Sequence, residues 1–178
     1  MSSKPVLAVI DVQVGSFKPH MQGLGEQIAE FAREWQGRGG SVLAFKYVNV
    51  KGSPCERFLD WREMYAPPET DLVESLSGFE QESVCRNVYS AVTPELKGLV
   101  GDDRSAVVCL VGIDTAACVQ KTALDLFDAG IRPFVVEELC ASGAGDSAHD
   151  AAIESLKRSI GLRQVGSREQ AFRLLQEC

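Results

Sequence analysis

Three residues that can support nucleophilic chemistry stand near the ends of separate predicted strands. Asp11 and Arg86 lie near the ends of two short apolar runs, and Cys118 follows a third. Because the carboxyl ends of the strands in an open α/β sheet meet at one crevice, we expect these three side chains to come together. A thiol, a carboxylate and a cation in one crevice supply a nucleophile, its base and a charge partner.

Cys118 lies in the first turn of a predicted helix that directly follows the valine-rich strand 106–111. We expect Gly112 to end the strand, Thr115 to cap the helix and Gly130 to end it. Open N–H groups and the positive end of the helix dipole favour a thiolate over a thiol and can hold an oxyanion. Position alone leaves open the alternative that Cys118 is a small residue buried at a turn.

Other catalytic combinations have less support in the sequence. His20 and His149 are the only histidines and stand far apart, and the six cysteines form no zinc-type CxxC pair. The sequence therefore predicts neither a metal nor an organic cofactor. Gly23 and Gly25 form a Gly-x-Gly after the first strand, but the third glycine of a dinucleotide fingerprint is missing.

The composition limits the class of protein and its partners. The chain has 178 residues, of which 45% are hydrophobic and 24% charged, with a net charge of −7. These values are typical of a globular domain and argue against nucleic acid or an anionic membrane as a main partner. No run reaches membrane-spanning length, and residues 1–5 are too short and polar for a signal peptide. We expect reduced thiols and a cytoplasmic location.

Strands and helices are predicted to alternate along the whole chain. Expected strands span 6–12, 41–48, 82–87, 106–111, 131–137 and 162–165. Helices are expected over 24–35, 56–65, 71–76 and 149–160, and after the caps Thr93, Thr115 and Ser167. The alternation predicts an α/β fold with a mostly parallel sheet, formed by residues 1–178 as a single domain.

Four runs of the sequence resemble motifs of the isochorismatase-like cysteine hydrolases, the superfamily that includes nicotinamidases and carbamoylsarcosine amidases. The runs are LAVIDVQVGSF, CRNVYSAV, VGIDTAACVQKTALDLFDAG and VVEELCAS. The resemblance implies a three-layer, doubly wound, six-stranded sheet with helices on both faces, assembled as a dimer or tetramer. It also implies catalytic roles for Asp11, Arg86 and Cys118, and a cis peptide bond between Ile113 and Asp114.

The chain departs from the family pattern at two places that bear on function. The family's catalytic lysine is Arg86 here, and the DxH zinc ligands of nicotinamidases have no counterpart in YVNVKGSPCERF. The second departure argues against nicotinamide as the substrate. Lys46, near the end of a neighbouring strand, is an alternative source of the cation.

The resemblance predicts a hydrolase that cleaves a small amide or related C–N bond. Asp11 would take the thiol proton, Cys118 would attack the carbonyl carbon, and the N–H groups of Cys118 and Asp114 would hold the oxyanion. Candidate walls of the substrate pocket are Phe17, Trp61 and Tyr89. Two alternatives stay open: an isochorismatase-type vinyl ether hydrolase that uses Asp11 as an acid, and a catalytically idle member that binds a metabolite or a protein.

Overall fold

A six-stranded parallel sheet forms the centre of the computed structural model, which describes residues 5–101, 103 and 105–176. The strands are β1 (Val6–Ile10), β2 (Ser41–Tyr47), β3 (Ser83–Arg86), β4 (Val107–Ile113), β5 (Arg132–Ala141) and β6 (Val165–Gly166). Their order in the sheet is β3-β2-β1-β4-β5-β6. The predicted α/β fold is confirmed, and the strand order reverses between β1 and β4, where open sheets form their ligand crevice.

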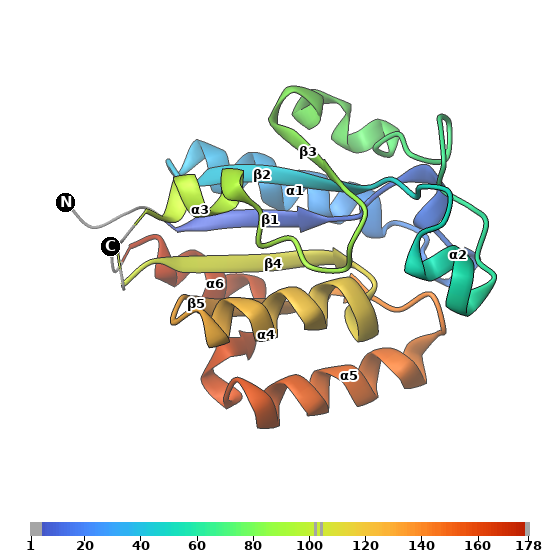
Figure 1. The fold of residues 1–178 in the computed structure, drawn as a ribbon. Coiled ribbons are helices and arrows are strands. Elements are labelled where there is room, and N and C mark those ends of the chain that lie inside the picture. The colour runs from blue at the N-terminus through green and yellow to red at the C-terminus, as the bar shows by residue number, and fades with distance from the viewer. Residues whose placement is uncertain (1–4, 102, 104, 177–178) are drawn as a thin grey trace.

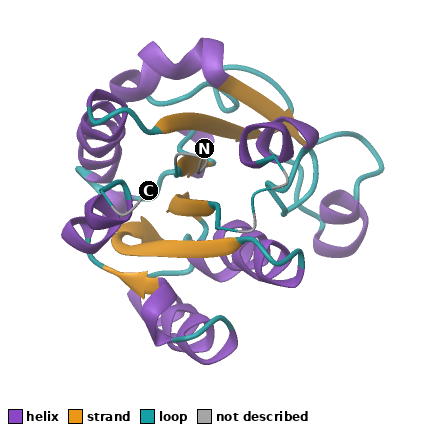
Figure 2. Cartoon of the chain, turned by 90° about the vertical axis from the view of Figure 1, so that its left-hand side faces the viewer, coloured by secondary structure: helices purple, strands orange, loops and turns teal. Residues whose placement is uncertain are grey.

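Helices cover both faces of the sheet, as Figure 2 shows. One face packs against α1 (Leu24–Gly37), α6 (Arg168–Leu174) and the 3-10 helix η3 (Glu74–Glu82). The other packs against α3 (Pro94–Val100), α4 (Gln120–Asp128) and α5 (Asp146–Ser159). Each large apolar side chain buried between the layers stabilises the fold by about 1.5–3 kcal/mol. None of the helices in the described residues is long and apolar enough to cross a bilayer.

Helix α2 (Pro54–Leu59) lies on the side where β1 and β4 end (Figure 1). The predicted helix over 56–65 is wrong at both ends. Ser53 caps α2 by accepting a hydrogen bond from the N–H of Glu56 at 3.1 Å, and Pro54 fills the first helical position. Asp60 ends the helix because its backbone is left-handed, with φ 51°, and its N–H returns to the helix. The chain is then irregular through Trp61. The helical piece predicted over 71–76 is replaced by η3.

Strand β4 continues through Gly112 to Ile113, so the prediction that Gly112 ends the strand is wrong. Its φ of 120° suits glycine, and a Cβ at this position would lie 2.0 Å from the carbonyl oxygen of Ile10. The helix cap is Asp114 rather than Thr115, since the Asp114 carboxylate accepts the N–H of Ala116 at 2.8 Å. Glycine thus lets β4 press against β1 just before the turn that carries Cys118.

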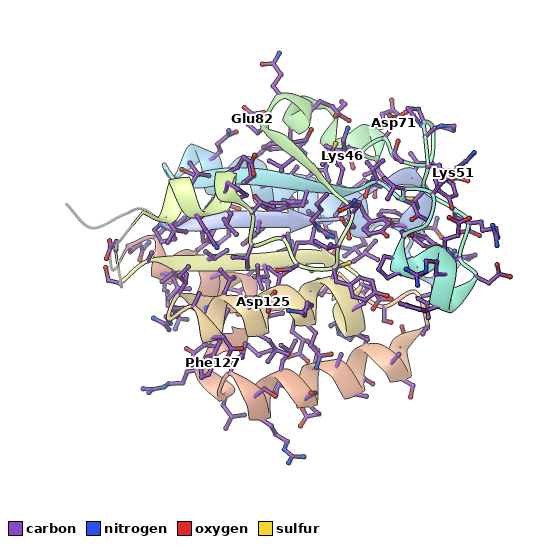
Figure 3. The ribbon with its side chains drawn as sticks, viewed as in Figure 1. Lys46, Lys51, Asp71, Glu82, Asp125 and Phe127 are labelled. Atoms are coloured by element: carbon purple, nitrogen blue, oxygen red, sulfur yellow. The ribbon has the colours of Figure 1, made fainter. Side chains whose placement is uncertain are left out.

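Other helix signals in the sequence are confirmed. Thr93 caps α3, and Ser167 forms a capping box with Gln170 at the start of α6. Gly130 follows α4 with a φ of 73°, as a glycine that ends a helix does. Phe127 of α4, labelled in Figure 3, is an apolar side chain that is 50% exposed and so does not pack in the core.

Candidate active site

Asp11 and Arg86 form a buried ion pair beyond the ends of β1 and β3. The distance from Asp11 Oδ2 to a terminal nitrogen of Arg86 is 2.7 Å, and the two side chains are only 6% and 3% exposed. Arg86 reaches across the intervening strand β2, with its guanidinium carbon 6.0 Å from the ring centre of Tyr47. The guanidinium also donates to the carbonyl of Val88. A fixed positive charge is therefore held against the carboxylate, away from water.

The backbone at Asp11 turns sharply out of β1. Its φ of 51° is left-handed, a conformation that aspartate tolerates better than most residues, and its N–H donates to the carbonyl of Phe45 at 3.0 Å. The second carboxylate oxygen, Oδ1, is buried and makes no hydrogen bond of normal geometry to the described residues. A buried oxygen left in this state is available to accept a proton.

Cys118 lies in a π-helical turn, η4 (Thr115–Val119), that leads into α4. The N–H groups of Ala117 and Val119 both donate to the carbonyl of Asp114, at 3.1 and 3.0 Å. Single π turns occur often at functional sites, and this one carries the thiol of Cys118 at the carboxyl end of β4.

Thr122 fixes the turn that carries Cys118. Its hydroxyl donates to the carbonyl of Cys118 at 2.7 Å and accepts the N–H of Ala91 at 2.9 Å. Ala91 belongs to the segment that follows Arg86, so one buried hydroxyl ties the nucleophile's turn to that segment. The sequence contains no signal that distinguishes this threonine from an ordinary helix residue.

Asp114 holds the other end of the turn. One carboxylate oxygen caps the helix at Ala116, and the other accepts the N–H of Gly143 at 2.7 Å. The peptide bond between Ile113 and Asp114 is cis, as the resemblance implied.

The electrostatics of the site work against a thiolate at rest. Burial, and then the Asp11 charge, raise the pKa of the Cys118 thiol well above its ordinary value, while Arg86 lowers it. Burial and the Asp11 charge therefore oppose the thiolate that the helix position was predicted to favour. Burial also raises the pKa of Asp11, against the lowering effect of Arg86. A raised carboxyl pKa makes Asp11 a stronger base toward the neighbouring thiol.

A cavity of about 240 Å³ opens over Cys118 and Asp11. Its walls include Tyr47, Cys55, Trp61, Met64 and Tyr89, together with the charged Lys18. The structure thus brings Trp61 and Tyr89 to the cavity, as the sequence predicts. The volume lies near the lower limit for ligand pockets, which indicates a small molecule at the reactive thiol.

Phe17 does not line this cavity, so its prediction as a pocket wall is wrong. Its ring is half-buried against the core cluster, near Gly25 and Val73. The neighbouring residues Ser16 and Lys18 line the cavity instead. The apolar ring turns inward because the core removes it from water, and this leaves the polar neighbours facing the site.

Lys46 does not supply the catalytic cation. The ammonium of Lys46, a residue labelled in Figure 3, pairs with Glu80 of η3 at 2.9 Å. Lys46 is not among the residues that line the cavity. Tyr47, the next residue, faces the cavity instead because successive strand side chains point to opposite faces.

The buried amide of Gln13 fixes the end of β2 at Tyr47. It accepts the N–H of Tyr47 at 2.7 Å and donates to the carbonyl of Tyr47 at 3.0 Å. Sequence analysis missed both Tyr47 and Gln13.

Both histidines lie outside the catalytic cavity. They line a larger hollow of about 690 Å³ beside β5. His20 bonds the carbonyl of Ser142 and His149 bonds the hydroxyl of Thr115, each at 2.9 Å. A histidine base at Cys118 is therefore not available in this arrangement.

The segment YVNVKGSPCERF, which has no counterpart of the nicotinamidase zinc ligands, does not fit a metal. Within it, the amide of Asn49 donates to the carbonyls of Trp61 and Glu63 at 3.2 and 3.1 Å and accepts the hydroxyl of Ser53 at 2.7 Å. Among the described residues, no group of three or more His, Cys, Asp or Glu side chains could hold a metal ion.

The fold and the site define a class of parallel α/β proteins with a buried cysteine where the strand order reverses. The family model "Isochorismatase domain" matches residues 5–168. The chain therefore belongs to the isochorismatase family of hydrolases. Its fold is similar to that of an isochorismatase-like hydrolase from Alkaliphilus metalliredigens, with a TM-score of 0.79, 18% identity, and coverage of 96% of this chain and 98% of that one.

Three further similarities concern individually named proteins. Nicotinamidase PncA from Bacillus subtilis aligns with a TM-score of 0.77 and 20% identity, covering 92% of this chain and 99% of that one. "Isochorismatase domain-containing protein 2" from Xenopus laevis is 37% identical over 73 residues, 39% of this chain and 35% of the relative. The mouse protein 2A is 39% identical over 59 residues, 33% of this chain and 29% of the relative. The sequence matches thus span about a third of each curated relative.

Proposed function

We propose that the protein is a cysteine hydrolase that cleaves a small-molecule amide or related C–N bond through a thioester on Cys118. The observation that carries the proposal is the buried group of Asp11, Arg86 and Cys118 at the floor of a small cavity, with a free carboxylate oxygen on Asp11. No cofactor enters the scheme.

The first step transfers a proton within the site. Asp11 accepts the proton of the Cys118 thiol as the sulfur attacks the carbonyl carbon. The charge of Arg86 stabilises the carboxylate before the transfer and the developing negative charge after it. Arginine remains protonated at any working pH, so it acts as a fixed charge and never as a proton donor.

The second step releases the amine. The backbone N–H groups of Cys118 and Asp114 donate to the oxyanion of the tetrahedral intermediate. The intermediate collapses as Asp11 returns its proton to the leaving amine, which leaves an acyl thioester on Cys118. Asp11 then takes a proton from water as the water oxygen attacks the thioester. The second intermediate releases the carboxylic acid, and Asp11 returns that proton to the departing sulfur, which restores the thiol.

A panel of small amides tests the reaction class. We expect the wild-type protein to hydrolyse at least one member, and Cys118→Ala to abolish the activity. Cys85→Ala is the matched control, because Cys85 is an exposed thiol on β3 and its loss should leave turnover unchanged. Hydrolysis that survives in Cys118→Ala would remove the covalent mechanism.

A second candidate is the vinyl ether hydrolysis of isochorismatases, with Asp11 as the acid. The raised pKa of Asp11 favours it, since a carboxyl group that keeps its proton can donate it to an enol ether carbon. Cleavage of isochorismate that is lost in Asp11→Asn but kept in Cys118→Ala would favour this reaction over amide hydrolysis.

The wider setting of the enzyme is also a proposal. We expect a small-molecule substrate, a reducing cytoplasmic environment and a homodimer or homotetramer. The five described cysteines are free thiols, which supports the reducing environment. Sedimentation velocity on the purified protein tests the assembly, and a monomer at all concentrations would contradict it.

A further inference from the structure

An apolar groove runs alongside the catalytic cavity. Nine large apolar side chains are exposed in the described part of the chain, and four of them gather here. Phe58 and Leu59 are 72% and 63% exposed on α2, and Val88 and Tyr89 are 57% and 42% exposed on the loop after β3. Exposed apolar side chains scattered singly need no explanation, but a cluster of this size marks a binding surface.

The groove and the catalytic cavity adjoin each other. The groove has a volume of about 490 Å³, against about 240 Å³ for the cavity. Cys55, Leu59 and Tyr89 line both of them, and the sulfur of Cys55 lies 4.0 Å from the hydroxyl of Tyr89. A ligand whose reactive carbon lies at Cys118 therefore reaches the groove by passing these three side chains.

The walls of the groove are held by the same contacts that hold the catalytic residues. The carbonyl of Val88 accepts a hydrogen bond from the guanidinium of Arg86. The opposite wall is α2, which is capped at both ends. The groove is thus fixed relative to the reactive group, as a substrate subsite must be to orient its ligand.

The chemistry of the lining indicates what the groove binds. Of the described residues that line it, only Lys121 is charged, and its ammonium is paired with Asp125 on the next turn of α4. The guanidinium carbon of Arg57 lies 5.0 Å from the ring centre of Phe58. Because the described lining carries no unpaired charge, the groove favours an uncharged apolar group over a charged one.

We propose that this groove, formed by Phe58, Leu59, Val88 and Tyr89, is a binding subsite for an apolar arm of the substrate. The substrate is then an amide that carries an alkyl or aryl group of several carbons, either on the acyl side or on the nitrogen. The proposal rests on the proposed hydrolase function. The nearness of the groove to Cys118 favours a substrate arm over a protein partner as its occupant.

Two homologous series of amides test the proposal. One is primary amides from acetamide to octanamide, and the other is N-alkyl acetamides of increasing chain length. We expect kcat/KM to rise roughly threefold per added methylene in one of the series, because each buried methylene contributes a nearly constant transfer free energy. The series that rises identifies the side of the amide that carries the arm. A flat response in both series would overturn the proposal.

Substitutions in the groove should remove the length dependence. Phe58→Ser and Val88→Ser are expected to lower the ratio of long-chain to short-chain kcat/KM at least tenfold. Phe127→Ser is the matched control, because Phe127 is also a half-exposed apolar side chain but lies outside the groove. An unchanged ratio in both groove variants would contradict the proposal.

Binding without turnover separates this proposal from the proposed reaction. Calorimetry on Cys118→Ala should show octanamide binding at least tenfold more tightly than acetamide, with the difference lost in Cys118→Ala/Phe58→Ser. This result would support the subsite even if the wild-type protein hydrolysed no amide. Equal binding of the two amides, with a dimer that dissociates on Phe58→Ser, would instead show that a second copy covers the groove, and would overturn the proposal.

Discussion

Arg86 determines how protons can move in this site. Where the family pattern has a lysine, the chain holds a guanidinium paired with Asp11 at 2.7 Å. A lysine can lose its proton when it is buried, whereas an arginine cannot. All proton transfer in the proposed mechanism therefore passes between Cys118, Asp11, the leaving amine and water.

The fixed-charge role predicts the order of activity among cation variants. Arg86→Ala should lower kcat by at least about a hundredfold, because the negative charge that develops in the site loses its cation. Removing one partner of a buried pair also leaves an uncompensated charge, which lowers the free energy of unfolding by about 3–5 kcal/mol. Arg86→Lys should keep a good part of the activity, limited by its shorter reach. Turnover on any accepted amide measures this, with circular dichroism to confirm folding.

Lys46→Ala is the control for the position of the cation. Because Lys46 pairs with Glu80 away from the cavity, its loss should leave turnover near the wild-type value. A damaging Lys46→Ala beside a nearly silent Arg86→Ala would contradict the assignment of Arg86 to the site.

The pH dependence follows from the pKa of Asp11. Burial raises this pKa and Arg86 opposes the rise, so the base becomes active as the pH increases through a value above the ordinary aspartate range. Removal of the positive charge in Arg86→Gln should raise the pKa further. We therefore expect the acid limb of the kcat/KM profile to move to higher pH in this variant. A limb that stays in place or moves to lower pH would be inconsistent with an Asp11 base beside Arg86.

At the scale of the elements, the contact of β4 with β1 positions the nucleophile. Gly112→Ala should both destabilise the protein and reduce activity, because the added Cβ would lie 2.0 Å from the carbonyl oxygen of Ile10. Overpacking of this kind costs about 1–3 kcal/mol. The φ of 120° at Gly112 adds strain to that cost. Urea unfolding measures the loss.

Gly98→Ala is the matched control for this substitution. Gly98 lies inside α3, and a Cβ there meets nothing within 4 Å. Alanine in a helix interior is more stable than glycine by about 0.5–1 kcal/mol. The two glycine substitutions should therefore change the free energy of unfolding in opposite directions, and a stabilising Gly112→Ala would refute the close approach of β4 to β1.

The sequence was sufficient to predict the helix caps Thr93 and Ser167. It did not predict that β4 continues to Ile113 or that Asp114 caps the turn of Cys118. The convergence of parallel strands predicted the meeting of Asp11, Arg86 and Cys118. The sequence could not predict that Phe17 lies outside the cavity, because loop side chains follow no regular period and this ring packs against the core. Applied more strictly, the two-residue period of strands would have selected Tyr47 as the residue facing the site.

Two further features depend on tertiary contacts that the sequence does not encode locally. Thr122 looks like any helix threonine until the N–H of Ala91 comes within 2.9 Å of its hydroxyl. The resting protonation of Cys118 depends on how deeply the thiol is buried and on the nearby carboxylate, and both raise the pKa of the thiol.

At the scale of the whole molecule, the chain is predicted to unfold as one cooperative domain. Trp35, on α1, is fully buried in the core cluster, whereas Trp61 packs on Tyr47 at the cavity, with 5.6 Å between the ring centres. Urea unfolding can be followed by the signal of Trp35 in a Trp61→Phe variant, by that of Trp61 in a Trp35→Phe variant, and by far-UV circular dichroism in both. Within each variant, the tryptophan transition and the circular dichroism transition should coincide. A separate early transition for Trp61 alone would show that the cavity segment unfolds independently.

Mass spectrometry of the protein during turnover tests the central claim most directly. Acid quenching of the wild-type enzyme with an accepted amide should give a protein mass increased by the acyl group, and the modification should map to the peptide that contains Cys118. The adduct should be absent from Cys118→Ala and should disappear when the substrate is consumed. An adduct that maps to Cys55, or amide turnover by Cys118→Ala with no adduct at all, would contradict the account.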